Sequence, residues 1–196
     1  MANKPLDTAL VDAAIRFAID AHAGTERRGK GFPYVLHVLE AASIVATMSP
    51  DPELLAAAVL HDTVEDTYVT LEQIRAQFGA RVAALVEAET DRLFAVEDES
   101  KTWRARKQAA IDRIAAAPRD AKMVALGDKL SNMRAIAMDY RRQGDALWTL
   151  FHAPGGRADH AWHYYGLAAS LAELEGTDAY REFKSLVEEV FGPAQG

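Results

Sequence analysis

Four side chains that can bind a metal ion or transfer a proton fall within six residues, His-Asp-Thr-Val-Glu-Asp at positions 61–66. An Ala/Leu-rich apolar run at 54–60 leads into them and predicts a buried helix, which we expect to continue to Thr67. On such a helix His61 would lie over Glu65, because residues four apart share a face. Three clustered carboxylates repel one another unless positive charge is near, so the segment predicts a divalent cation. Taken alone, a charged helix end explains it equally well.

Two other places in the sequence carry further candidate ligands. His37 begins an otherwise apolar helical pattern, and Asp128 follows the apolar run at 123–127, where an unpaired carboxylate would be costly to bury. Asn132 lies one turn after Asp128 on the same face. Two histidines and two aspartates form a mixed nitrogen and oxygen donor set, which suits Mn²⁺, Zn²⁺ or Fe²⁺. Four protein ligands leave open positions only on an octahedral ion, so Mn²⁺ or iron is favoured over zinc.

The composition places these residues in a globular chain with an ordinary core. The chain has 196 residues, of which 49% are hydrophobic and 26% charged, and its net charge is −7. That charge disfavours a nucleic-acid polymer as partner but allows a small phosphorylated ligand. There is no cysteine, which excludes disulfides and thiolate metal ligands and suits the cytoplasm. We expect neither a secretory signal nor a membrane span, and hence a cytoplasmic protein.

Apolar positions recur at helical spacing along nearly the whole chain, which predicts an all-α fold. We expect one domain over residues 1–196, with its core at about 6–191 and a frayed tail at 192–196. Loops are expected at 23–32, which is rich in glycine and cations, and at 92–102, which is acidic. The predicted helices are 6–22, 34–48, 52 onward, a capped helix from Thr70 to Phe78, 80–91, 103–116, 119–141, a short one ending at 152, 158–174 and 178–191.

Several blocks, in order, resemble one enzyme family. They are Ala-His-Ala-Gly at 21–24 with Arg-Arg at 27–28, Pro-Tyr-Val-Leu-His at 33–37, the segment 61–67, Phe-Gly at 78–79, Thr-Asp at 90–91, and Asp-Lys-Leu-Ser-Asn-Met-Arg at 128–134. Together they resemble the metal-dependent HD-domain hydrolases of the RelA/SpoT type, specifically the stand-alone small alarmone hydrolases (Mesh1-like). The resemblance implies a helical HD domain that removes the 3′-diphosphate of ppGpp or pppGpp with Mn²⁺, giving GDP or GTP and pyrophosphate.

The resemblance also assigns roles to individual residues. It implies His37, His61, Asp62 and Asp128 as metal ligands. Glu65 and Asp66 match the pair that activates and orients the attacking water, and Asn132 matches an amide near the ribose and the scissile phosphate. Arg27 and Arg28 match the basic pair that packs on the base, and Tyr164 lines up with a nucleotide-contacting tyrosine. Lys101, Arg104, Arg106 and Lys107 have no counterpart; they could hold the 5′ phosphates or form a solvated helix face.

The chain departs from the family pattern at three places. Val38 stands where long members often have proline, the loop 24–33 is one residue longer than in the bifunctional enzymes, and the acidic segment 92–102 is also longer. An adenine alarmone such as (p)ppApp, or NADPH, is therefore an alternative substrate, and a non-catalytic nucleotide-binding module is a third reading. The chain is too short for the synthetase domain of the long members. The oligomeric state stays open, a homodimer included.

Overall fold

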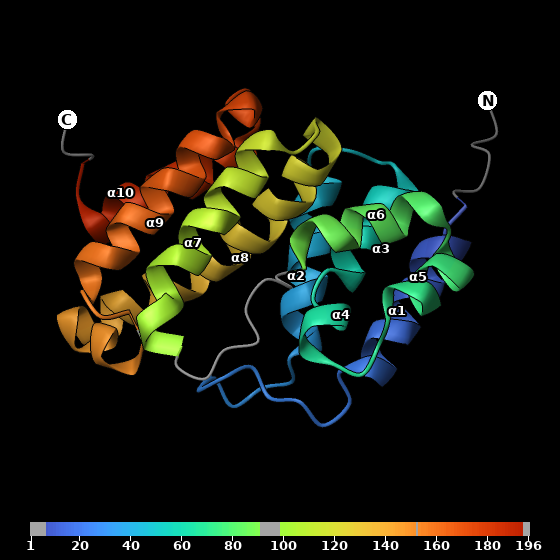
Figure 1. Ribbon diagram of the computed structural model, residues 1–196, viewed down its shortest axis with the longest axis horizontal. Helices are drawn as coiled ribbons and strands as arrows, with labels where there is room; N and C mark the ends of the chain where they lie inside the picture. Colours follow the sequence, from blue (N-terminus) through green and yellow to red (C-terminus); the bar gives the residue numbers. More distant parts are fainter. Residues whose placement is uncertain (1–6, 91–98, 152, 194–196) are drawn as a thin grey trace. The chain divides into compact units, whose positions relative to one another are not determined.

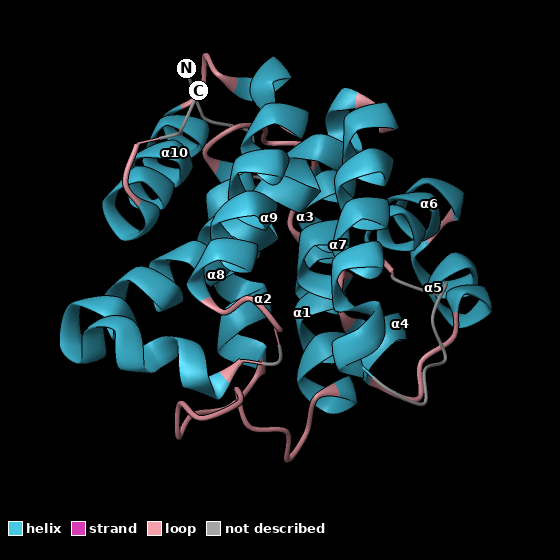
Figure 2. Ribbon diagram, turned by 60° about the vertical axis from the view of Figure 1, so that its left-hand side comes forward, coloured by secondary structure: helices cyan, strands magenta, loops and turns pink. Residues whose placement is uncertain are grey.

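The computed structural model describes residues 7–90, 99–151 and 153–193, with the side chains of 99–101 left out. Over this part of the chain the regular structure is helical, and no strand is present (Figure 2). A backbone bridge pairs Glu26 with Pro33. The predicted all-α fold is therefore confirmed. None of the helices within the described ranges combines the length and the apolar stretch needed to cross a bilayer.

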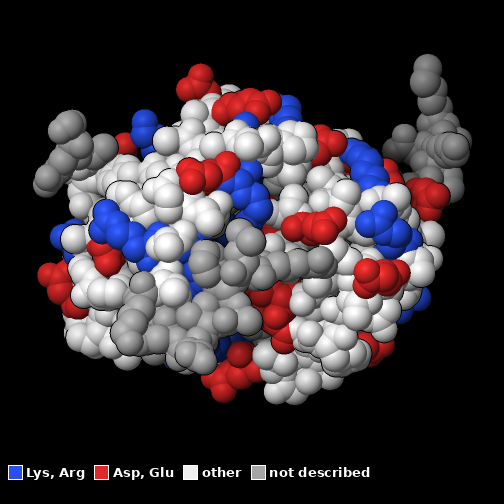
Figure 3. All heavy atoms as spheres, in the orientation of Figure 1, with Lys and Arg blue, Asp and Glu red and all other residues white. Residues whose placement is uncertain are grey.

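The chain divides into two compact units, Met1–Thr90 and Asp91–Gly196. The single domain expected from the sequence stays a prediction. On the face drawn in Figure 3, basic and acidic side chains of the described residues are interspersed.

The first unit is built around α3 (Pro52–Leu60), which packs against α1 (Ala9–Ala21), α2 (Val35–Ala46) and α6 (Ala80–Glu89) (Figure 1). Almost every residue of α3 is apolar, and a helix that is apolar all round can be buried on every side. Two shorter helices complete the unit. They are α4 (Thr63–Asp66) and α5 (Leu71–Phe78).

The start of α3 is defined by side chains that the sequence places there. Asp51 caps the helix by accepting a hydrogen bond from the Glu53 amide, and Pro52 occupies the first turn, where its missing N–H is not needed. Arg81 of α6 pairs with the carboxylates of Asp51 and Glu53, both at 2.7 Å. The N-terminus of α3 is thus fixed to a neighbouring helix, which sets the position of its far end.

The prediction that one unbroken helix runs from Pro52 to Thr67 is wrong about where that helix ends. It ends at Leu60, and a turn at residues 61–62 separates it from α4. Two side chains bond backwards to carbonyls of α3: the Thr63 hydroxyl donates to Leu60 O at 2.7 Å, and His61 Nδ1 lies 2.8 Å from Ala58 O. Such bonds compete with the helical backbone pattern, which explains the break.

Other boundaries in the first unit agree more closely with prediction. Thr70 and Gln73 form the expected capping box of α5, and Gly79 ends that helix with φ 93°. The first helix begins at Ala9 rather than residue 6, which lies outside the described residues. Before this helix, Asp7 accepts a hydrogen bond from the Ala9 amide, and the hydroxyl of Thr8 donates to Asp12.

In the second unit α8 (Arg119–Gln143) packs against α10 (Asp178–Phe191), and α7 (Glu99–Ala116) packs against α9 (Arg157–Ser170). Short 3-10 segments follow α8 and α9, at Gly144–Leu150 and Ala172–Leu174. Two Arg–Glu pairs seven residues apart, Arg134–Glu182 and Arg141–Glu189, connect α8 to α10 at 2.7 Å each. The helix α10 has the bounds that the sequence predicts.

Three predictions in this unit need correction. Helix α7 begins at Glu99, so residues 99–102 are helical and not part of a loop; residues 91–98 lie outside the described part of the chain. The helix predicted to continue to Leu174 ends at Ser170, where the backbone changes to a 3-10 turn. The short helix predicted to end at 152 ends at Leu150, and of the predicted frayed tail, residues 194–196 are not described.

Candidate metal centre

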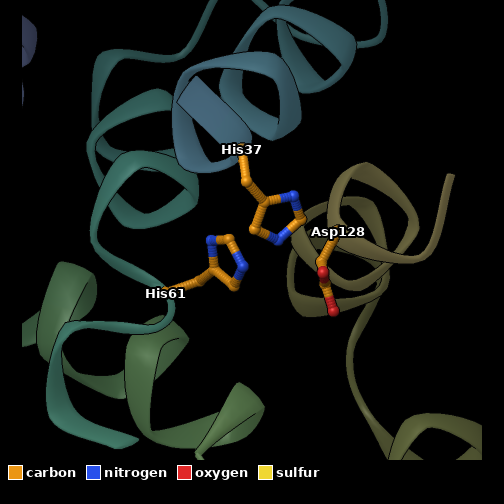
Figure 4. Close-up of side chains that lie close together, drawn as sticks. All are labelled: His37, His61 and Asp128. Carbon is orange, nitrogen blue, oxygen red and sulfur yellow. The ribbon is translucent and has the colours of Figure 1, made fainter. Parts of the chain in front are cut away.

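Two buried histidines face one another in the first unit. His37 lies in the first turn of α2 and His61 directly follows α3, and their ring centroids are 5.4 Å apart (Figure 4). Both side chains are buried, although histidine is costly to bury without a partner. The packing of α2 against α3 therefore brings together two imidazoles that are 24 positions apart in the sequence.

Asp62 connects the two histidines through one carboxylate oxygen. Its Oδ2 lies 2.9 Å from His61 Nε2 and 3.5 Å from His37 Nε2. The Tyr34 hydroxyl donates to the same oxygen at 2.6 Å. Because the turn after α3 replaces a helical register, Asp62 and His61 point toward a common place although they are adjacent in sequence.

The tautomer of His61 follows from its other ring nitrogen. Nδ1 lies 2.8 Å from the carbonyl oxygen of Ala58, and a carbonyl can only accept a hydrogen bond. Nδ1 therefore carries the proton, and in the neutral ring Nε2 presents its lone pair toward Asp62 Oδ2. Two electron-rich atoms 2.9 Å apart repel one another unless a proton or a cation lies close to both.

The acidic pair after this turn lies on α4. Glu65 and Asp66 are both exposed. Partial desolvation, followed by the negative charge of Asp62, raises the pKa of Asp66. Asp66 thus lies close enough to Asp62 for that charge to act on it. The expected stacking of His61 over Glu65 on one continuous helix is replaced by this turn.

The other predicted ligand, Asp128, lies in α8 of the second unit and is buried. Its two oxygens accept hydrogen bonds from Lys129 Nζ and Asn132 Nδ2, both at 2.5 Å. The predicted placement of Asn132 one turn after Asp128 on the same face is therefore confirmed. Like His37 and His61, Asp128 offers an atom that can ligate a metal ion, and Figure 4 draws all three side chains.

The predicted basic pair lies in a loop that folds back on itself. The Arg27 amide donates to Phe32 O at 2.9 Å, and Glu26 accepts from the Gly31 amide at 2.8 Å. The guanidinium of Arg27 lies over the Tyr34 ring, 5.2 Å from its centroid, and Arg28 is exposed. Arg27 and Arg28 therefore lie in a loop whose backbone is held by its own hydrogen bonds.

Two of the substrate-contacting candidates lie in the second unit. Tyr164 is buried, with its ring stacked on Phe191 at 5.8 Å and near Phe183 at 6.2 Å. These contacts give Tyr164 a packing role, and the nucleotide contact stays a prediction. The side chain of Lys101 lies outside the described residues. Arg104, also considered for phosphate binding, pairs with Asp159 at 2.8 Å.

Sequence reasoning missed Tyr34 and His22 as parts of this site. Burial, followed by the negative charge of Asp62, raises the pKa of Tyr34, so its phenol keeps the proton that it donates. His22 is buried with its ring tilted against Tyr34 at 4.9 Å, and burial lowers its pKa. Both residues fall within blocks that resemble the family, at 21–24 and 33–37, but no role was predicted for either. Tyr34 also lies three residues before His37, one helical turn away.

Comparison with known proteins agrees with this geometry. The family model described as HD domain matches residues 14–156, well over half of the chain. The chain belongs to the HD-domain family. The match includes His37, His61, Asp62 and Asp128, so all four predicted ligands lie within the HD domain.

Full-length relatives of this HD-domain chain are short enzymes. It is 32% identical over 181 residues to guanosine-3′,5′-bis(diphosphate) 3′-pyrophosphohydrolase MESH1 of Danio rerio, covering 90% of this chain and 91% of the relative. It is 34% identical to the MESH1 protein of Mus musculus, with coverages of 92% and 93%. A probable enzyme of the same name from Synechocystis is matched at 31% identity, but over 24% of its length.

Solved structures show the same relationship. One, described as a metazoan ortholog of SpoT that hydrolyzes ppGpp, superposes with a TM-score of 0.77 at 25% identity and covers 97% of this chain and all of that one. A Listeria monocytogenes protein superposes with a TM-score of 0.69 at 28% identity, covering 83% of this chain. The chain is thus an HD-domain phosphohydrolase homologous to stand-alone enzymes, and the predicted family resemblance is confirmed.

Proposed function

We propose that this protein hydrolyses ppGpp and pppGpp at the 3′-diphosphate, giving GDP or GTP and pyrophosphate, with Mn²⁺ as its cofactor. The observation that carries the proposal is the approach of the His37 and His61 Nε2 atoms to a single oxygen of Asp62. The substrate is proposed from the MESH1 relatives, of which this chain covers 91% and 93%.

The donor set fits a divalent cation. Metal–ligand bonds of about 2.1 Å at right angles place neighbouring ligand atoms about 3 Å apart. The 2.9 Å separation of His61 Nε2 from Asp62 Oδ2 has this length, and a cation would remove the repulsion between them. We propose His37, His61, Asp62 and Asp128 as the ligands. A mixed set of imidazole and carboxylate donors suits Mn²⁺, which would supply positive charge against the phosphate.

When bound, the cation would supply water acidified from a pKa of ~15.7 toward neutrality and positive charge against the phosphate oxygens. Glu65 would accept a proton from the attacking water as the water oxygen bonds to the phosphorus attached to the ribose 3′ oxygen. The bond between that phosphorus and the 3′ oxygen would break, and the 3′ oxygen would take up a proton from Glu65 or solvent to give the 3′-hydroxyl. Asp66, with its raised pKa, would orient Glu65 and the water. Asn132 already bonds to Asp128, and we propose that its amide also lies near the ribose.

Arg27 and Arg28 would bind the base of the nucleotide. A planar guanidinium can stack on a purine, which the point charge of lysine does less well. The loop that carries them supports this role, because its internal backbone bonds lower the entropy lost when the loop holds a ligand. A protein with net charge −7 could in this way bind a strongly anionic nucleotide through one cation and one basic loop.

The test is product release from purified, Mn²⁺-loaded protein given ppGpp, pppGpp, ppApp and NADPH in separate reactions, each with an EDTA control. Pyrophosphate is measured for the alarmones and orthophosphate for NADPH. We expect EDTA-sensitive release from both guanosine compounds. Turnover of ppApp or NADPH alone would overturn the guanine assignment while keeping the hydrolase. Metal binding with no turnover of any compound would instead favour a nucleotide-binding module.

A further inference from the structure

Tyr34 lies where the basic loop meets the proposed metal ligands. It immediately precedes α2, one turn before His37, and its ring is half-buried. Its hydroxyl donates a 2.6 Å hydrogen bond to Asp62 Oδ2, the oxygen nearest to both histidines. A hydrogen bond of this length to a carboxylate is among the strong ones in proteins.

The ring of Tyr34 has little freedom to move. His22 packs against it at 4.9 Å with an interplanar angle of 31°, and His37 meets it edge-on at 5.6 Å. The Arg27 guanidinium lies 5.2 Å from the ring centroid. The Tyr34 amide donates to Thr25 O at 2.8 Å, which fixes the backbone as well. The direction of the phenol is therefore determined by groups other than Asp62.

We propose that Tyr34 is a positioning residue that holds the Asp62 carboxylate in the orientation needed to bind the cation. The proposal rests on the metal site of the proposed function. A carboxylate on a short side chain can rotate, and a partial turn moves Oδ2 away from the two histidine nitrogens. The fixed phenol restricts that rotation, so Asp62 is oriented before the metal arrives. Donors of this kind behind a metal ligand typically change metal affinity 10–100-fold.

The test is Tyr34→Phe, which removes the hydroxyl and keeps the ring contacts with His22, His37 and Arg27. Mn²⁺ affinity of the metal-free protein is measured by the loss of the free Mn²⁺ electron paramagnetic resonance signal, which needs no substrate. The visible absorption spectrum of the Co²⁺-loaded protein reports the geometry of the ligands. Tyr180→Phe is the matched control, because it removes a phenol that donates to Ala168 O at 2.9 Å within the second unit.

We expect Tyr34→Phe to weaken Mn²⁺ binding roughly 10–100-fold and to alter the Co²⁺ spectrum, while Tyr180→Phe changes neither. A Mn²⁺ affinity within twofold of the unmodified protein would overturn the proposal. An equal loss in both variants would also overturn it, because the effect would then come from general destabilisation. Since the measurement uses metal alone, failure of the protein to hydrolyse ppGpp leaves this result interpretable.

Discussion

At the scale of single residues, Asp62 contacts three other side chains of the first unit: His37, His61 and Tyr34. One of its oxygens lies near two imidazole nitrogens and accepts from a phenol, and its charge raises the pKa of Asp66. Its neighbour His61 has its tautomer set by a helix carbonyl. Replacing a residue with this many contacts should affect Mn²⁺ binding and turnover together.

Asp62→Ala should therefore abolish Mn²⁺ binding and turnover at once. The variant removes a proposed ligand, and with it the negative charge beside His37 and His61 that would attract a cation. Titration calorimetry with Mn²⁺ and the pyrophosphate assay measure the two effects. Full activity in this variant would remove the proposed site.

Glu65→Gln should separate the effect on Mn²⁺ binding from the effect on turnover. The amide keeps the size of the side chain but cannot accept the proton, so we expect Mn²⁺ affinity to be retained and kcat to fall roughly 10²–10⁴-fold. Calorimetry on the same preparation gives the metal affinity. If Mn²⁺ binding is lost along with the rate, Glu65 is a ligand and not a base.

Residue types, spacing and the family resemblance gave His37, His61, Asp62 and Asp128 as predicted metal ligands. They were not enough for Tyr34, whose partner Asp62 is 28 positions away. A tyrosine on an apolar helix start is usually a packing residue, and its hydrogen bond exists only once α2 and α3 are placed together.

At the scale of helices, boundaries with a chemical signal were predictable and those without one were not. Asp51 with Pro52, and Thr70 with Gln73, fix their helix starts through caps that the sequence displays. The break after Leu60 has no such signal, because residues 54–60 favour a helix throughout. It results from side chains of His61 and Thr63 that bond to carbonyls of α3.

Gly79 joins α5 to α6 with φ 93° and ψ 169°, a conformation that only glycine adopts readily. Gly79→Ala should lower the free energy of unfolding by roughly 1–3 kcal/mol, although a Cβ there would meet no atom within 4 Å. Urea unfolding gives the value. Gly176→Ala is the control, since that position has open space and no positive φ, and should change stability by about 0.5 kcal/mol or less. Equal losses would show that backbone strain is not the cause.

At the scale of the molecule, helical periodicity predicted the fold class, and cap residues predicted where α3 and α5 begin. Periodicity does not predict which polar side chains are buried in the core. In the second unit His160 and His163 are buried beside Trp103, with ring centroids 5.3 and 6.1 Å away. Burial, followed by the charge of Lys107, lowers the pKa of His160 to about 4 and that of His163 to about 2.

These two histidines should make the protein less stable in mild acid. Both stay neutral in the folded state, whereas in the unfolded chain each takes up a proton below its ordinary pKa of 6.5. Stability is therefore present above that pH and is lost as the pH falls, by at most about 1.4 kcal/mol per pH unit for each histidine. Urea unfolding between pH 7.5 and pH 5 measures the slope.

His163→Leu is the variant that isolates this effect, because leucine fills the site and does not titrate. We expect a shallower loss of stability below pH 6.5 than in the unmodified protein. An unchanged slope would assign the acid sensitivity to carboxylates elsewhere in the chain.

The basic loop is closed at its base. Glu26 pairs with Pro33, and the Tyr34 amide bonds to Thr25 O, so the turn at Gly29–Gly31 lies beyond a fixed neck. Both of these glycines have positive φ, and neither would bring a Cβ within 4 Å of another atom. Exchange of either glycine would strain the backbone, whereas residues inserted between them would extend into solvent without displacing Tyr34. The length of this turn can therefore vary among related chains while Tyr34 keeps its hydrogen bond to Asp62.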